Sequence, residues 1–136
     1  MSVAPLLDTH AWLWWIHRDT RLSVDFLDTL DGLPANDRPQ ISDISLWEVA
    51  LLTARGRLEL TMPLGPWLEI ASHPRSVRVI PISAAIAAET AAPALSALRD
   101  PADRIIVATS RILGAPLLTR DRTIQRSRLV APWAPG

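Results

Sequence analysis

The sequence contains no cysteine, no lysine and no long apolar run. The absence of cysteine excludes disulfides, thiol chemistry and any zinc site built on thiolates. A membrane-spanning helix needs about 20 consecutive apolar residues, and no stretch of this chain approaches that length. The N-terminal stretch MSVAPLLDTH has no basic leader and carries an acid at position 8, which argues against a signal peptide. We therefore expect a cytoplasmic protein that does not associate with a membrane.

The length of 136 residues predicts a single domain over 1–136, and an apolar content of 49% is ordinary for a globular protein. Short apolar runs predict strands at 3–7, 38–42, 77–82 and 116–119. Periodic segments predict helices at 9–18, 23–32, 44–56, 63–73 (interrupted by Pro66), 83–92 and 101–113. An additional edge strand is expected at 129–133. Strands that alternate with helices indicate an α/β fold, with a mostly parallel sheet covered on both faces.

Two aspartates three residues apart open the helix in RDPADRIIVATSRILG (99–114). Asp100 fits the N-cap, Pro101 the first helical position and Asp103 the third. An acid in the first turn also suits the helix dipole. Helix capping alone thus accounts for this segment, and only the rest of the chain can show whether either aspartate has a second role.

Other acids follow predicted strands. Asp8 comes directly after the first strand, and Asp121 comes two residues after PLLT (116–119). In open parallel α/β sheets, functional groups gather beyond the carboxyl ends of the strands, and the start of the 101–113 helix is expected at the same rim. Each aspartate can cap a helix, but capping gives no reason for several negative charges to share one edge.

Glu48 lies on an apolar stripe of the helix ISLWEVALLTARG (44–56), where an unpaired carboxylate is costly. An arginine partner is the structural explanation, and a metal shared with the aspartates is the functional one. Several carboxylates without cysteine fit a hard divalent cation such as Mg²⁺ or Mn²⁺. Such an ion activates water and neutralises phosphate in phosphoryl chemistry.

The charge is unevenly distributed although the net charge is zero. Residues 1–68 carry nine acids and five arginines, and residues 69–136 carry five acids and nine arginines. A basic C-terminal half suits a phosphate-rich partner. Scattered, solvated arginines are the alternative explanation.

Four motifs resemble, in order and spacing, the acidic motifs of PIN-domain proteins, and most of all the VapC-type toxin ribonucleases: LLDTHAWLWW, ISDISLWEVALLTARGRLEL, DPADRIIVATS and LLTRDRTI. The resemblance implies a three-layer α/β/α fold and an Mg²⁺-dependent endoribonuclease, with Mn²⁺ able to substitute. It implies metal-binding, catalytic roles for Asp8, Glu48, Asp103 and Asp121, with Asp100 mainly a cap. Small polar residues beside the acids, with Asp100, are expected to orient the site: Thr9, Ser45 and Thr119. The residues expected to contact RNA are Arg104, Arg120, Arg122 and Arg126.

The resemblance also implies a cognate antitoxin and a homodimer. Trp12 and Trp15 share one face of the 9–18 helix and Trp14 points elsewhere, so at least one is expected to be half-exposed and to suit a groove for a partner helix.

Three other classes of protein require residues that this sequence lacks. A haloacid-dehalogenase-type phosphatase needs a second aspartate where His10 stands, and it needs a lysine. A receiver-type phosphoacceptor and a P-loop enzyme also need a lysine. The remaining alternatives are a PIN-like nucleic-acid-binding module and another metal-dependent phosphohydrolase without a toxin role.

Overall fold

A computed structural model describes residues 4–136, whose strands form one parallel sheet. The strands are β1 (Leu6–Leu7), β2 (Gln40–Ser42), β3 (Arg78–Ile80) and β4 (Leu117–Leu118). Their order is β3-β2-β1-β4, and every ladder between these strands is parallel. The predicted parallel α/β fold is therefore confirmed. Val3, the first residue of the first predicted strand, lies outside the described residues.

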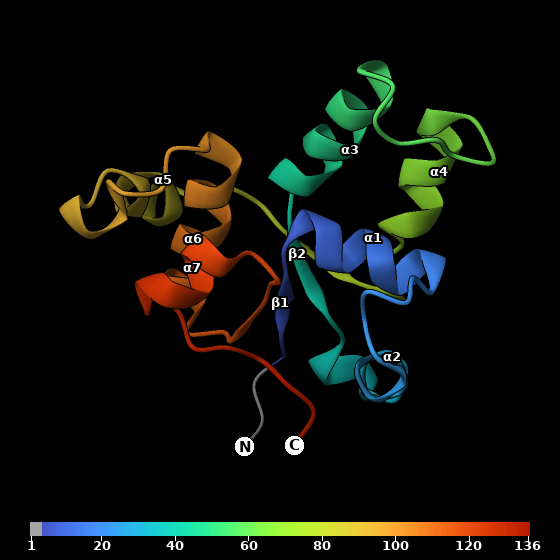
Figure 1. Cartoon of the computed structure of the whole chain (residues 1–136), viewed down its shortest axis with the longest axis horizontal. Helices are drawn as coiled ribbons and strands as arrows, with labels where there is room; N and C mark the ends of the chain where they lie inside the picture. The colour runs from blue at the N-terminus through green and yellow to red at the C-terminus, as the bar shows by residue number, and fades with distance from the viewer. Residues whose placement is uncertain (1–3) are drawn as a thin grey trace.

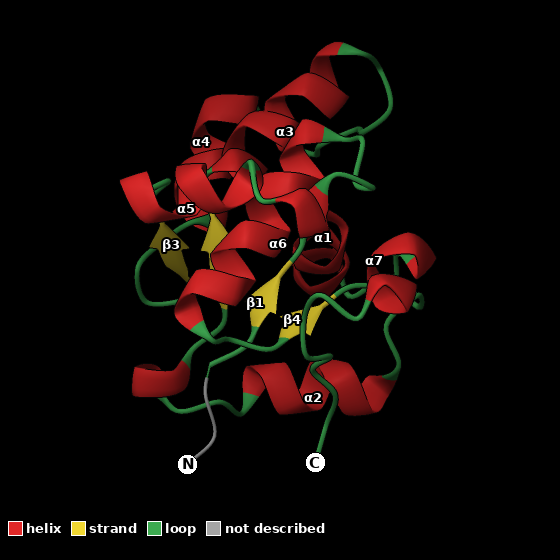
Figure 2. Cartoon of the chain, turned by 90° about the vertical axis from the view of Figure 1, so that its left-hand side faces the viewer, coloured by secondary structure: helices red, strands yellow, loops and turns green. Residues whose placement is uncertain are grey.

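Helices cover both faces of this sheet. The helices of the N-terminal half are α1 (Thr9–His17), α2 (Val24–Asp31), α3 (Ile44–Ala54) and α4 (Leu64–Ala71). Those of the C-terminal half are α5 (Ala84–Thr90), α6 (Pro101–Leu113) and α7 (Arg122–Ser127). Short 3₁₀ turns lie at Ala35–Asp37 and Pro93–Leu95. Figure 1 shows the first group on one side of the strands and the second group on the other, and Figure 2 shows α6 in front of β1.

The side chains of β1, β2 and β4 are buried on one face of the sheet or the other. Successive side chains of a strand point to opposite faces, so Leu7 joins the core formed with α1 to α4, and Leu6 joins the core formed with α5 to α7. Leu118 and Leu117 divide in the same way. Two separate apolar cores thus hold the three layers together.

Local signals set most of the helix ends. Ser23 and Gly32 flank α2 as predicted, and Gly114 ends α6 in the left-handed region at φ 63°. The expected interruption of α4 at Pro66 is wrong. Pro66 occupies the third helical position, where a backbone N–H has no intrahelical acceptor, so the proline costs no hydrogen bond.

The C-terminal segment differs from its prediction in two ways. The predicted edge strand is reduced to an isolated parallel bridge between Leu117 and Pro132. The sequence also gave no sign of α7, because Ile124 is its one buried residue and leaves no apolar periodicity. No described helix is both long and apolar enough to cross a bilayer.

Candidate functional site

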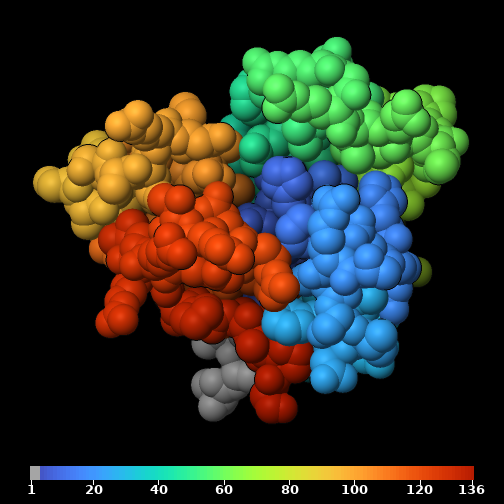
Figure 3. Space-filling view, in the orientation of Figure 1, coloured from blue at the N-terminus to red at the C-terminus, as the bar shows by residue number. Residues whose placement is uncertain are grey.

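The predicted acids meet in one cavity beyond the carboxyl ends of the strands. Asp8 follows β1, Asp121 follows β4, and Glu48 comes from α3, the helix after β2. The first turn of α6 brings Asp100 and Asp103 to the same place. All five carboxylates line a cavity of about 490 Å³. Figure 3 shows the surface hollowed where the blue α1, the teal α3 and the orange α6–α7 region meet.

Three of these aspartates are also helix N-caps. The Oδ1 atoms of Asp8, Asp100 and Asp121 accept hydrogen bonds from backbone N–H groups of α1, α6 and α7, at 2.8, 2.8 and 3.0 Å. Each cap occupies one carboxylate oxygen with a backbone N–H and leaves the second oxygen for other contacts. The predicted N-cap at Asp100 is confirmed. Capping fixes the backbone position of each acid at the cavity.

Glu48 is held by hydroxyl groups. The Thr9 hydroxyl donates a hydrogen bond to Glu48 Oε1, and the Thr9 and Ser45 hydroxyl oxygens lie 2.8 Å apart. Thr9 has a single hydroxyl proton and gives it to Glu48, so Ser45 donates to Thr9. Thr119 accepts from the Asp121 backbone N–H at 3.0 Å. Thr9 and Thr119 therefore hydrogen-bond directly to residues of the acidic site, and Ser45 reaches Glu48 through Thr9.

The arginine partner that would explain Glu48 structurally is not observed. Among residues 4–136 the ion pairs are Arg18–Asp31, Arg21–Asp19 and Arg111–Glu89, all outside this set of acids. Glu48 thus sits partly buried beside other carboxylates without a cationic side chain in contact.

Burial and mutual repulsion raise the pKa of three acids. Burial is the main cause for Asp8, where hydrogen bonds from Thr119 and the Ala11 N–H partly offset the rise in pKa. Burial also raises the pKa of Glu48, against the hydrogen bond from Thr9. The pKa of Asp103 rises to about 7, first through burial and then through the charges of Asp100, Asp121, Glu48 and Asp8. The cavity therefore favours either protons or a bound cation.

The donor set fits a hydrated hard cation. Every carboxylate is an oxygen donor, and oxygen is what Mg²⁺ prefers. Across the described part of the chain, no three His, Asp or Glu side chains converge into a ready-made cluster of ligands. Mg²⁺ usually keeps several waters and binds through one or two carboxylates, so a wide acidic cavity suits it better than a tight cage.

Cationic and aromatic residues complete the cavity lining. Arg120 is one of the arginines predicted to contact RNA, and it lines the cavity together with His10, Trp14 and Arg21. No sequence pattern predicts a role for Arg21, because it lies in the loop after α1, far along the chain from every acidic motif but the first.

Two of the arginines predicted to contact RNA, Arg122 and Arg126, lie exposed on α7 outside the cavity lining. Arg104 is tied to the loop before α6, since its guanidinium donates to the carbonyl groups of Leu98 and of Ser96. Asp43 also stays outside the cavity and accepts a hydrogen bond from the Ile82 N–H at 3.2 Å.

The fold and the cavity define a parallel α/β protein with an acidic site at the carboxyl edge of its sheet. The PIN domain family matches residues 6–128, and the chain belongs to this family. It is 34% identical over 128 residues to Ribonuclease VapC22 of Mycobacterium tuberculosis (strain ATCC 25618 / H37Rv), covering 93% of this chain and 94% of that protein. The predicted family membership is confirmed.

Solved structures share the fold. VapBC2 from Rickettsia felis, bound to a DNA fragment from its promoter, has a TM-score of 0.69 at 17% identity and covers 96% of this chain and 98% of its own. FitAB bound to an IR36 DNA fragment has a TM-score of 0.63 at 24% identity and covers 96% and 94%. A toxin–antitoxin complex from Klebsiella pneumoniae has a TM-score of 0.57 at 21% identity and covers 87% of each chain.

Proposed function

We propose that this chain is a metal-dependent endoribonuclease and the toxin of a toxin–antitoxin pair. Asp8, Glu48, Asp103 and Asp121 would together hold a hydrated Mg²⁺, which Mn²⁺ would be able to replace. The observation that carries the proposal is a cavity lined by five carboxylates, none of which has a salt-bridge partner among the described residues. The likeness to Ribonuclease VapC22 supports RNA as the substrate.

The bound cation supplies the chemistry of phosphodiester hydrolysis, because it lowers the pKa of water and neutralises phosphate. The residues of the chain position the reacting groups. Thr9 and Ser45 orient Glu48, Thr119 orients the Asp8 carboxylate and accepts from the Asp121 backbone N–H, and the helix caps fix Asp8 and Asp121. These three acids are held before the substrate arrives, which reduces reorganisation in the transition state.

The substrate contacts follow from the charges around the cavity. Arg21 and Arg120 lie at its lining, where a phosphate chain entering an acidic site needs positive charge. Arg122 and Arg126 are exposed on α7, next along the chain, and extend this positive charge. Arg104 has its Nε and one terminal nitrogen engaged by backbone carbonyls and retains at most a minor role in binding RNA.

RNA cleavage with and without EDTA tests the proposal. Purified protein should cut single-stranded RNA in Mg²⁺ and lose this activity in excess EDTA, and added Mg²⁺ or Mn²⁺ should restore it. Single-stranded DNA of the same base sequence is the control substrate and should be cut far more slowly. RNA cleavage that persists in EDTA would contradict the metal requirement. RNA that stays intact with every metal tested would contradict the proposed nuclease activity.

We also propose where the antitoxin binds. A cavity of about 280 Å³ lies at the end of α1 and is lined by Trp15, Ile16 and Ile70, with Ile70 64% exposed. Trp12 and Trp15 share one face of α1. Because Trp12 is fully buried, Trp15 is the one of the two that a partner can contact. An amphipathic antitoxin segment would bury this apolar surface.

We further propose a homodimer located in the cytoplasm, where RNA is available.

Ile70→Arg should weaken antitoxin binding about tenfold or more, because it places a charge in an apolar contact. RNA cleavage by the free protein should not change. Calorimetry with the co-expressed antitoxin gives the affinity, and hydrogen exchange should show residues 11–17 protected in the complex. Ile112→Arg, on α6 at the other face of the sheet and 43% exposed, is the matched control. If both variants bind as tightly as the parent and 11–17 exchange freely, the antitoxin binds elsewhere.

A further inference from the structure

A second cavity continues from the carboxylate cavity along α1 and α3. Its volume is about 520 Å³, and it shares His10, Trp14, Arg21, Glu48 and Asp100 with the first cavity. Five shared lining residues make the two cavities one connected depression. We call the part beyond the carboxylates the α1–α3 groove, defined by Leu13, Trp14, Leu51, Arg55, Arg57 and Leu58.

The α1–α3 groove has an apolar floor and a cationic rim. Leu13, Leu51 and Leu58 supply apolar surface, and Arg55 and Arg57 stand at the end of α3. Gly56, at φ 70°, turns the chain between these two exposed arginines. Within residues 4–136, neither arginine has a carboxylate within salt-bridge distance or a side-chain hydrogen bond. Asp19, which also lines the second cavity, is already paired with Arg21 at 3.5 Å.

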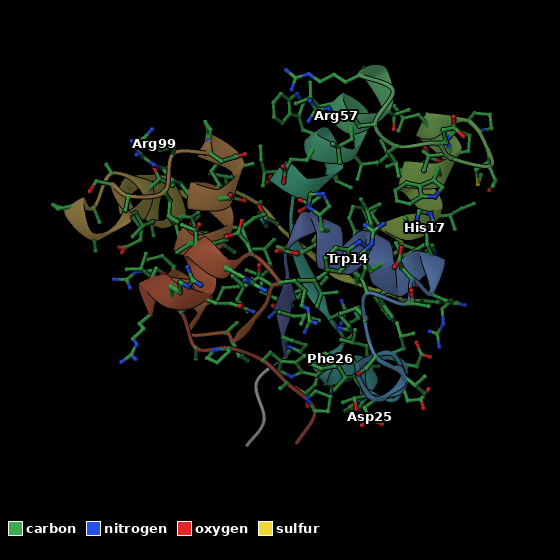
Figure 4. The ribbon with its side chains drawn as sticks, in the orientation of Figure 1. Trp14, His17, Asp25, Phe26, Arg57 and Arg99 are labelled. Atoms are coloured by element: carbon green, nitrogen blue, oxygen red, sulfur yellow. The ribbon has the colours of Figure 1, made fainter. Side chains whose placement is uncertain are left out.

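Trp14 offers a stacking surface where the groove meets the carboxylate cavity. Its ring is half-buried, and the Arg21 guanidinium lies over it at 5.6 Å from the ring centroid. The His10 ring lies 6.0 Å from the same indole. Arg21 is an exposed side chain, so the Trp14 face that it covers lies at the surface of the groove and not in the core, and a nucleobase can take the place of the guanidinium. Figure 4 shows Trp14 on α1 and Arg57 at the far end of α3.

We propose that the α1–α3 groove is a binding subsite for single-stranded RNA on one side of the scissile phosphate. A nucleobase stacks on Trp14, and the following phosphates contact Arg55 and Arg57. This inference rests on the proposed endoribonuclease function. An aromatic ring beside unpaired arginines is the combination by which proteins bind single strands with little regard for sequence. The groove opens directly into the carboxylate cavity, so an RNA strand held there has to continue into it, and this favours RNA over a peptide as the occupant.

Equilibrium binding separates the groove from the chemistry. Every variant is made in an Asp103→Asn background so that labelled RNA stays intact, and binding in Mg²⁺ is followed by fluorescence anisotropy. Trp14→Ala should weaken binding about tenfold, and Trp14→Phe should recover most of the loss, because stacking survives on a smaller ring. Trp47→Ala is the matched aromatic control, since Trp47 is 56% exposed and lines neither cavity.

Salt dependence tests the arginines. For single strands, each phosphate contact contributes about 0.7 to the slope of log K against log salt, so Arg55→Ala with Arg57→Ala should reduce that slope by about 1.4. Arg75→Ala with Arg78→Ala is the control pair, because both residues are exposed and line neither cavity. An abasic oligonucleotide of equal length should lose the Trp14 effect and keep the arginine effect.

The outcomes distinguish the subsite from the function. The subsite is wrong and the function stands under one set of results. In that case the Asp103→Asn protein binds RNA, the wild type cleaves it, and the groove variants bind RNA as the control variants do. If the wild type neither binds nor cleaves RNA, the function fails and the subsite fails with it. If Trp14→Ala weakens the abasic oligonucleotide equally, Trp14 has a structural role and stacking is wrong. If the groove variants lose antitoxin binding but keep RNA binding, the groove is a protein-docking surface and the proposal is overturned.

Discussion

Asp103→Asn is expected to lower Mg²⁺-dependent RNA cleavage by about a thousandfold or more, because metal catalysis is worth several kcal/mol of transition-state stabilisation. The fold should survive. Asparagine has the same shape, and the Asp103 side chain has no hydrogen bond within the described chain that this change would break. Initial rates of cleavage in saturating Mg²⁺ give the size of the effect, and circular dichroism confirms the fold.

Asp100→Asn is the matched control for this result. Asp100 caps α6 through Oδ1, which asparagine replaces well, so this variant should fold normally and retain substantial activity. Equal and total loss in both variants would show that Asp100 shares the metal-binding role. Full activity in Asp103→Asn would remove Asp103 from the site.

The second large effect concerns the stability of the metal-free protein. The pKa of Asp103 rises from 3.8 to about 7 on folding, so between these values the native state binds more protons than the unfolded state. The free energy of unfolding must then fall as the pH rises from about 4 to about 7. In EDTA the protein should melt about 4 °C or more lower at pH 7.5 than at pH 5.5, after allowance for the partial exposure of Asp103. Mg²⁺ should raise the melting temperature at pH 7.5 more than at pH 5.5, because protons compete for the same carboxylates.

Asp8→Asn tests the same repulsion from a different residue. Burial raises the pKa of Asp8 and asparagine preserves its helix cap, so the variant should melt a few degrees above the wild type in EDTA and respond less to Mg²⁺. Asp31→Asn is the control, since Asp31 is paired with Arg18 on the surface, and it should leave the Mg²⁺ response unchanged. An Asp8→Asn variant that melts below the wild type in EDTA, together with a wild type that ignores Mg²⁺, would indicate a structural network instead of a metal site.

The sequence predicts the acidic edge well because the rules involved are local or topological. Asp8 and Asp121 follow buried strands, and parallel strands bring their carboxyl ends together. Asp100 is recognisable as an N-cap from the proline after it. Glu48 stands out because a carboxylate on an apolar stripe needs compensation.

The sequence predicts less where a side chain has several possible directions. Arg104 counts as one positive charge in the sequence, but its guanidinium turns back to two backbone carbonyls. Arg21 reaches the carboxylate cavity from a loop whose path depends on the packing of α1 and α2. Helical spacing predicts that Trp14 and Trp15 point apart, but which of them faces the carboxylate cavity depends on how α1 is oriented in the fold. These residues depend on tertiary packing, and no local pattern encodes it.

The double use of aspartates as helix caps and site residues has an evolutionary consequence. Under selection against the proposed toxicity, a change to alanine at Asp8 or Asp121 would remove a carboxylate of the proposed site and also a cap worth about 1 kcal/mol. A change at Asp103 removes only the carboxylate. Inactivated copies that remain folded and still engage an antitoxin should therefore arise mostly through Asp103, or through asparagine and serine at the capping positions. Such copies would compete for antitoxin and thereby release active toxin from inhibition.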